Sequence, residues 1–207
     1  MGRTAGRCGD VGHHSAYRCG DGRALVFENE GVRIAIITCD LTNMPAGIAT
    51  VVRRLVERQA GIPASHVMVS ATHAHTAPVI LSGWTRYVLD GEMKRIADEY
   101  AAALPARIVK SVTEAVARLR PARVSASIGE APALAFHRRF HMKDGSVGWN
   151  PGKLNPNIVR AAGPIDPAIP LVYVEGEDGQ AIAAYVNYAI HLDTVGGTEF
   201  SSDLVYS

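Results

Sequence analysis

The sequence has few cysteines and no excess of charge of either sign, and both features narrow the class of protein. Its three cysteines, Cys8, Cys19 and Cys39, form no Cys-x-x-Cys pair, so the sequence predicts neither a disulfide framework nor a cysteine zinc site. With 21 basic and 20 acidic residues, the formal net charge is +1 at pH 7. A protein that binds nucleic acid carries a basic surface. We therefore expect no nucleic-acid partner.

Long apolar runs are also missing. No run is long enough to span a bilayer, so we expect no transmembrane segment. The first seven residues include basic side chains but no apolar stretch behind them, which argues against a secretory signal peptide. The chain as written is expected to be soluble, and its oligomeric state cannot be read from the sequence.

The composition is that of a globular protein. Of the 207 residues, 47% are hydrophobic, which is enough for a sizeable core in one domain. Residues 1–22 are rich in Gly, His and Arg and show no periodicity, so an irregular segment is predicted there. Residues 23–207 are predicted to form the folded domain.

The first half of this domain has the pattern of alternating strands and helices. Residues 24–28 and 32–40 predict a hairpin whose second strand is buried on both faces. Apolar residues at helical spacing predict a helix over 46–60, with Gly61 as its stop. Residues 66–75 predict a further strand, and the order strand, helix, strand favours a parallel pair. The predicted fold class is α/β, with a mixed β-sheet and flanking helices.

The second half predicts one long helical region followed by further strands. The helical stripe of residues 92–119 contains Pro105, which predicts either a kink or two consecutive helices. Downstream we expect a strand over 123–130, a hairpin over 136–147 turning at Asp144-Gly145, a proline-rich surface loop over 150–170, and a last hairpin over 171–190.

Three histidines stand where apolar runs end. His73 and His75 are two apart, and side chains two apart project from the same face of a strand. His191 ends the last apolar run in the same way. Neutral imidazole suits zinc, and a catalytic zinc site takes about three protein ligands. The spacing favours a metal or catalytic site, and the alternative is that these are hydrogen-bonded structural histidines.

Asp40 follows the second predicted strand and has two interpretations. Its carboxylate could support the histidine site from behind, or it could cap the turn that follows. The sequence does not decide between them.

Several motifs resemble the neutral/alkaline, non-lysosomal ceramidase family. They are Ala-Thr-His-Ala-His-Thr-Ala-Pro at 71–78, the stretch 187–199 around His191, Met-Lys-Asp-Gly at 142–145, Asn-Pro-Gly at 150–152 and Gly-Pro-Ile-Asp-Pro at 163–167. These motifs occur in the family's order, from about residue 23 to about residue 203.

The resemblance implies a zinc amidohydrolase that cleaves the N-acyl bond of ceramide, a small lipid substrate, into a sphingoid base and a fatty acid. It implies that His73 and His191 bind zinc and that His75 works on the substrate. Arg138 matches an arginine that contacts the reacting group, although His137 stands where the family has asparagine. In this interpretation His75 transfers protons and Arg138 stabilises the developing oxyanion. The alternative for Arg138 is a solvated arginine on a hairpin.

The resemblance also implies that part of the site lies elsewhere. In the family the other zinc ligands, a glutamate and a tyrosine, and the proposed catalytic serine come after the point that aligns with His191. We therefore expect residues 23–207 to be the amino-terminal portion of a catalytic domain, from a fragment or a frameshifted product. We expect this chain alone to bind zinc weakly and turn over little. The family likeness suggests a secreted or extracytoplasmic location.

Two other functions stay open. One is a non-catalytic module that binds lipids or acyl amides and keeps the pocket without the reaction. The other is a hydrolase of the same fold that acts on a different amide or ester.

Overall fold

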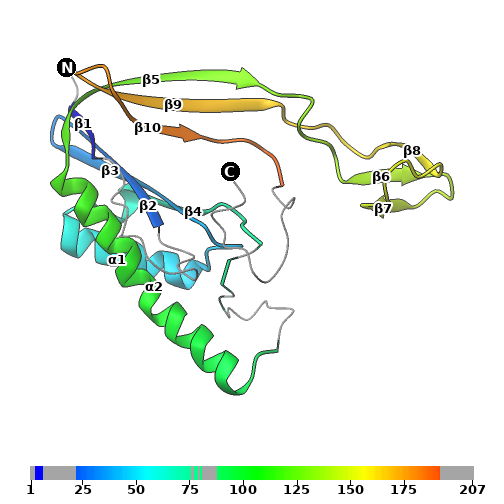
Figure 1. Ribbon diagram of the computed structural model, residues 1–207, viewed down its shortest axis with the longest axis horizontal. Coiled ribbons are helices and arrows are strands. Elements are labelled where there is room, and N and C mark those ends of the chain that lie inside the picture. Colours follow the sequence, from blue (N-terminus) through cyan, green and yellow to red (C-terminus); the bar gives the residue numbers. More distant parts are fainter. Residues whose placement is uncertain (1–2, 7–21, 76, 79, 81–87, 192–207) are drawn as a thin grey trace. The chain divides into compact units, whose positions relative to one another are not determined.

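The computed structural model describes residues 3–6, 22–75, 77–78, 80 and 88–191. Two sheets form, a seven-stranded sheet in the order β10-β9-β5-β1-β2-β3-β4 and a three-stranded sheet in the order β7-β6-β8 (Figure 1). The elements in chain order are β1 (Arg3–Gly6), β2 (Gly22–Asn29), β3 (Val32–Cys39), α1 (Ala46–Ala60), the 3₁₀ helix η1 (Ala64–His66), β4 (Val67–Ala71), α2 (Gly91–Ala117), β5 (Arg120–Glu130), β6 (Arg139–Met142), β7 (Val147–Trp149), β8 (Ile158–Ala161), β9 (Ala168–Gly176) and β10 (Ala181–Val186). Helices and a mixed sheet together confirm the predicted α/β class.

The chain divides into two compact units. The first contains the described residues of Met1–Val124 and Tyr173–Ala183, and the second contains Ser125–Val172 and Ala184–His191. Strands β5, β9 and β10 each run from one unit into the other. The elements α1, α2 and β1 to β4 lie wholly in the first unit, and β6 to β8 lie wholly in the second.

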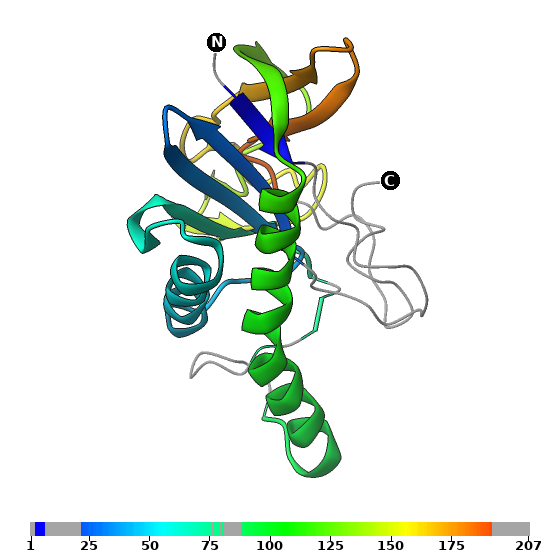
Figure 2. The same cartoon turned by 90° about the vertical axis from the view of Figure 1, so that its left-hand side faces the viewer.

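The predicted hairpin and the predicted parallel pair both form. β2 and β3 are antiparallel, with Leu25 opposite Ile36, and β4 runs parallel to β3, with Met68 beside Ile36. The prediction that β3 is buried on both faces was wrong. Ala35, Ile37 and Cys39 are buried, whereas Ile34, which points to the other face, is 41% exposed. Both helices lie on the same face of these strands, so only alternate residues of β3 enter their core (Figure 2).

Helix α1 has the predicted bounds. Its inward side chains Val52 and Val56 are fully buried, and the helix ends at Gly61, whose φ of 65° is left-handed. Glycine adopts this conformation without a Cβ penalty, which makes it a common residue after a helix end. Val52, Val56 and the following Ile62 belong to the core against β2, β3 and α2.

Helix α2 is one helix, so the alternative of two consecutive helices was wrong. Pro105 lies inside it and lacks the N–H of a helical hydrogen bond. On both sides of the proline the helix buries apolar side chains, with Leu104, Ile108 and Val112 fully buried. Packing of this stripe therefore outweighs the local cost of the proline. None of the described helices is both long and apolar enough to cross a membrane.

A short strand forms in the segment predicted to be irregular. β1 pairs antiparallel with both β2 and β5. Its residues Arg3–Gly6 have no strand pattern, so the pairing depends on the neighbouring strands. Residues 7–21, which include Cys8 and Cys19, lie outside the described residues. The boundary between residues 1–22 and 23–207 therefore stays a prediction.

The second unit contains the predicted hairpin and one strand that was missed. β6 and β7 are antiparallel around a turn in which Gly145 has a φ of 84°. Ser146 donates two hydrogen bonds to the Asp144 carboxylate, which lowers the pKa of Asp144. The stretch 150–170 is not only loop, because β8 pairs with β6. Residues 157–163 contain no proline, which leaves their N–H groups free for pairing.

The last predicted hairpin also forms. β9 and β10 are neighbours in the sheet, and the turn between them is closed by a hydrogen bond from the Gly176 N–H to the Gln180 carbonyl at 2.9 Å. β10 ends at Val186, so His191 lies in the segment after the strand rather than at its last residue.

Cys39 is fully buried at the end of β3, and its buried thiol should make the folded protein less stable at alkaline pH. Burial, and secondarily the neighbouring Asp40 carboxylate, raises the pKa of its thiol from 9.0 to about 12. Above pH 9 the unfolded chain loses this proton while the folded chain keeps it, so stability falls from about pH 9 to about pH 12. Urea unfolding across this range should show a decline for the wild type that is steeper than for Cys39→Ala, by up to about 1.4 kcal/mol per pH unit. Parallel declines would contradict the assignment.

Candidate metal centre

His73 and His75 lie in a loop after β4, at the carboxyl end of the parallel pair β3 and β4. The prediction that they share a strand face was wrong, because β4 ends at Ala71. His73 has a φ of 66°, which is left-handed and does not occur in a strand. The predicted closeness of the two rings is nevertheless present, and the turn of this loop produces it.

Backbone hydrogen bonds tie this loop to the loop after β3. The Thr72 N–H donates to the Cys39 carbonyl at 2.9 Å, and the Ala74 N–H donates to the Leu41 carbonyl at 3.1 Å. The Thr42 hydroxyl donates to the Ala74 carbonyl at 2.9 Å. Ala74 is fully buried between the two exposed histidines. Both sides of His73 are therefore anchored to the end of β3.

The two rings meet through their Nε2 atoms. His73 Nε2 and His75 Nε2 are 3.1 Å apart, and the rings are almost perpendicular, with an interplanar angle of 88°. His73 Nδ1 lies 2.7 Å from the Thr42 carbonyl oxygen. Two nitrogens on one tetrahedral zinc, each at about 2.0–2.1 Å from the ion, lie about 3.3 Å apart. The spacing is thus compatible with one ion near both rings.

The left-handed backbone of His73 has a cost that substitution can measure. His73→Gly and His73→Ala both remove the ring, but only glycine adopts a φ of 66° without a Cβ penalty. We expect His73→Gly to be more stable than His73→Ala by about 1 kcal/mol in chemical unfolding. Equal stability of the two variants would show that the backbone is not strained there.

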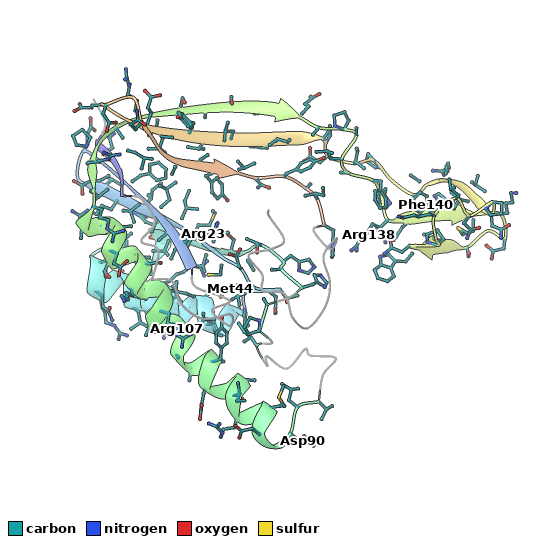
Figure 3. All side chains as sticks on the ribbon, viewed as in Figure 1. Arg23, Met44, Asp90, Arg107, Arg138 and Phe140 are labelled. Atoms are coloured by element: carbon teal, nitrogen blue, oxygen red, sulfur yellow. The ribbon has the colours of Figure 1, made fainter. Side chains whose placement is uncertain are left out.

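Asp40 supports the loop that carries His73. It is 6% exposed, and its Oδ1 accepts a hydrogen bond from the Thr72 hydroxyl at 3.1 Å. The Arg23 guanidinium lies 3.9 Å from Oδ2, and Figure 3 labels this arginine on β2. Of the two interpretations of Asp40 from the sequence, these contacts favour support of the site.

His191 belongs to the second unit. The segment that precedes it is fixed by two hydrogen bonds, from the Asn187 N–H to the Pro170 carbonyl at 3.0 Å and from the Tyr188 hydroxyl to the Ala131 carbonyl at 2.6 Å. The His191 side chain is half-buried. Like His73 and His75, His191 has an imidazole nitrogen of the kind that can bind a metal ion.

Arg138 also belongs to the second unit, immediately before β6. Its guanidinium lies over the Trp149 ring, 5.4 Å from the ring centroid, and the Asn150 N–H donates to the Arg138 carbonyl at 2.8 Å. Figure 3 labels Arg138 beside the three-stranded sheet. Stacking on an aromatic face orients a guanidinium without neutralising it. The oxyanion role of Arg138 stays a prediction.

Thr42 was not predicted from the sequence. Its carbonyl oxygen contacts His73 and its hydroxyl contacts Ala74. A backbone carbonyl leaves no trace in the sequence, and a threonine beyond a strand end is common in turns. The available signal was its place just beyond a parallel strand, where ligands gather in α/β sheets.

Comparisons with solved structures identify the fold. No protein-family model and no curated protein sequence matches the chain. One similar solved structure is described as a ceramidase complexed with C2, with 23% sequence identity and a TM-score of 0.64, over 98% of this chain and 32% of that one. Another is neutral ceramidase from Pseudomonas aeruginosa, with 23% identity and a TM-score of 0.63, over 97% of this chain and 33% of that one. The chain spans about one third of the length of these proteins. It has the fold of that part of a neutral ceramidase.

Proposed function

We propose that this chain carries part of the active site of a zinc-dependent hydrolase that cleaves the N-acyl bond of ceramide-like lipids. The products would be a sphingoid base and a fatty acid. The observation that carries the proposal is the His73–His75 pair, held at the carboxyl end of two parallel strands. The shared fold with ceramidases supports the choice of substrate class.

The residues present fit a zinc ion. A ligating histidine usually donates its other ring N–H to a carbonyl or carboxylate, and His73 Nδ1 has such a partner in the Thr42 carbonyl. We assign His73 and His191 as zinc ligands. The proposal includes that His191, from the second unit, binds the same ion as His73. When bound, zinc supplies an activated water and polarises the amide carbonyl.

The remaining assignments concern protons and charge. His75 takes the proton of the attacking water and passes it to the amide nitrogen as the C–N bond breaks. Arg138 stabilises the negative charge that develops on the carbonyl oxygen. Both side chains keep polar atoms accessible, since His75 is exposed and Arg138 is only half-buried. A secreted or extracytoplasmic location is proposed with this function.

The test is a substrate panel of a fluorescent N-acylsphingosine, a matched fatty amide and a matched fatty ester. Because the chain spans about one third of its structural neighbours, we expect slow turnover, measured by mass spectrometry of long incubations. Sphingoid base should be released only with added zinc, and not by His75→Ala. The matched control His141→Ala, in the second unit, should behave as the wild type.

The other outcomes separate the competing functions. Faster release from the ester or the simple amide would indicate a hydrolase of the same fold with another substrate. Lipid binding that is unchanged by chelator and by His73→Ala, without any hydrolysis, would indicate a binding module and would contradict the proposal.

A further inference from the structure

We infer that Thr42 is a positioning residue that presents His73 Nε2 for metal binding through two separate hydrogen bonds. The inference rests on the proposed function in one respect, namely that His73 is a ligand. The role assigned to Thr42 is indirect. It acts through the ring of His73 and through the backbone of Ala74.

The first hydrogen bond fixes the tautomer of His73. A carbonyl oxygen can only accept, so at 2.7 Å from the Thr42 oxygen the Nδ1 atom must carry the hydrogen. In the neutral ring Nε2 then holds the lone pair. His73 Nε2 lies 3.1 Å from His75 Nε2. In the absence of an ion, His75 Nε2 must carry a hydrogen and donate it to His73 Nε2. The nitrogen available for a metal is therefore already selected.

The second hydrogen bond holds the backbone that places the ring. The Thr42 hydroxyl donates to the Ala74 carbonyl, while the Ala74 N–H donates to the Leu41 carbonyl. Both polar groups of Ala74 are thus bonded to the loop after β3. A φ of 66° is unfavourable for histidine, and the residue keeps this conformation only where surrounding contacts hold the backbone in place. Without the hydroxyl, the loop has one fewer restraint on the residue that follows His73.

The experiment compares Thr42→Val with Thr42→Ser. Valine keeps the branched shape of the half-buried threonine and removes the hydroxyl, and serine keeps the hydroxyl. The first readout needs no metal. Nitrogen-15 NMR of the histidine rings, at about pH 8.5 where an ordinary imidazole is neutral, reports which ring nitrogen carries hydrogen. The His73 signals are assigned by their loss in His73→Ala.

We expect the wild type, Thr42→Ser and Thr42→Val all to show His73 protonated on Nδ1 alone, because each of them keeps the carbonyl of residue 42. The second readout is zinc affinity by competition with a chromophoric chelator. Thr42→Val should bind about 10-fold more weakly than the wild type, and Thr42→Ser should stay within about 2-fold. Circular dichroism confirms that each variant is folded.

Two results would overturn the inference. One is wild-type His73 protonated on Nε2, and the other is a folded Thr42→Val protein that binds zinc as tightly as the wild type. Failure of the proposed function looks different. If the tautomers behave as expected but neither the wild type nor any variant binds zinc, Thr42 still positions His73, and the metal assignment is wrong.

Discussion

His73→Ala is expected to weaken zinc binding by about 100-fold or more. Loss of a supporting residue behind a metal ligand typically costs 10- to 100-fold in affinity, and loss of the ligand itself should cost at least as much. The effect should be large here because the ring is aimed by its Thr42 partner and stands 3.1 Å from His75. The measurement is competition with a chromophoric chelator, supported by the absorption of the cobalt-substituted protein.

His66→Ala is the matched control for this experiment. His66 is also exposed, lies in the same unit, and its Nδ1 contacts a backbone carbonyl, that of Arg33, at 3.0 Å. It precedes β4, whereas His73 follows the strand, so its loss should leave zinc affinity unchanged. Equal weakening in both variants would indicate loose binding at surface histidines and would remove the basis of the proposed centre.

Ile37→Ala is expected to cost about 4 kcal/mol of unfolding free energy. Ile37 is fully buried in the core that β3 forms with helices α1 and α2. Truncation of a buried isoleucine removes its transfer free energy and leaves a cavity, which together cost about 2–5 kcal/mol. A site with helices on one side and a hydrogen-bonded sheet on the other has little freedom to collapse. The upper part of that range is therefore expected.

Ile34→Ala provides the comparison on the same strand. Ile34 points to the opposite face of β3 and is 41% exposed, so the same truncation should cost about 1 kcal/mol. Urea unfolding monitored by circular dichroism gives both values. If the two substitutions cost the same, the assignment of inward and outward faces of β3 is wrong.

The elements with strong local patterns could be predicted from the sequence. Helix α1 follows from its apolar spacing and from Gly61, and the β6–β7 turn follows from Asp144-Gly145. Strands β1 and β8 could not be predicted, because they form by pairing with neighbours that are distant in the sequence. The exposed face of β3 was misjudged because a run of apolar residues does not reveal which side the helices cover.

The candidate site was predicted in part and for a partly wrong reason. Strand periodicity suggested that His73 and His75 face the same way, and their rings do meet, but the left-handed turn at His73 brings them together. No residue pattern announces that conformation at a histidine. The role of Thr42 depends on a carbonyl oxygen that every residue possesses. Only folded geometry identifies which carbonyl is used.

β4 stands at the end of the sheet order among the described strands, and this position affects how the histidine pair can move. Detaching β4 from its sheet breaks a single ladder, the one with β3, and leaves the packing of α2 on β2 in place. Such peeling is a sub-global fluctuation, with a free energy below that of complete unfolding. The histidine pair can therefore change position by fraying at the margin of the sheet while the packing of α2 on β2 persists.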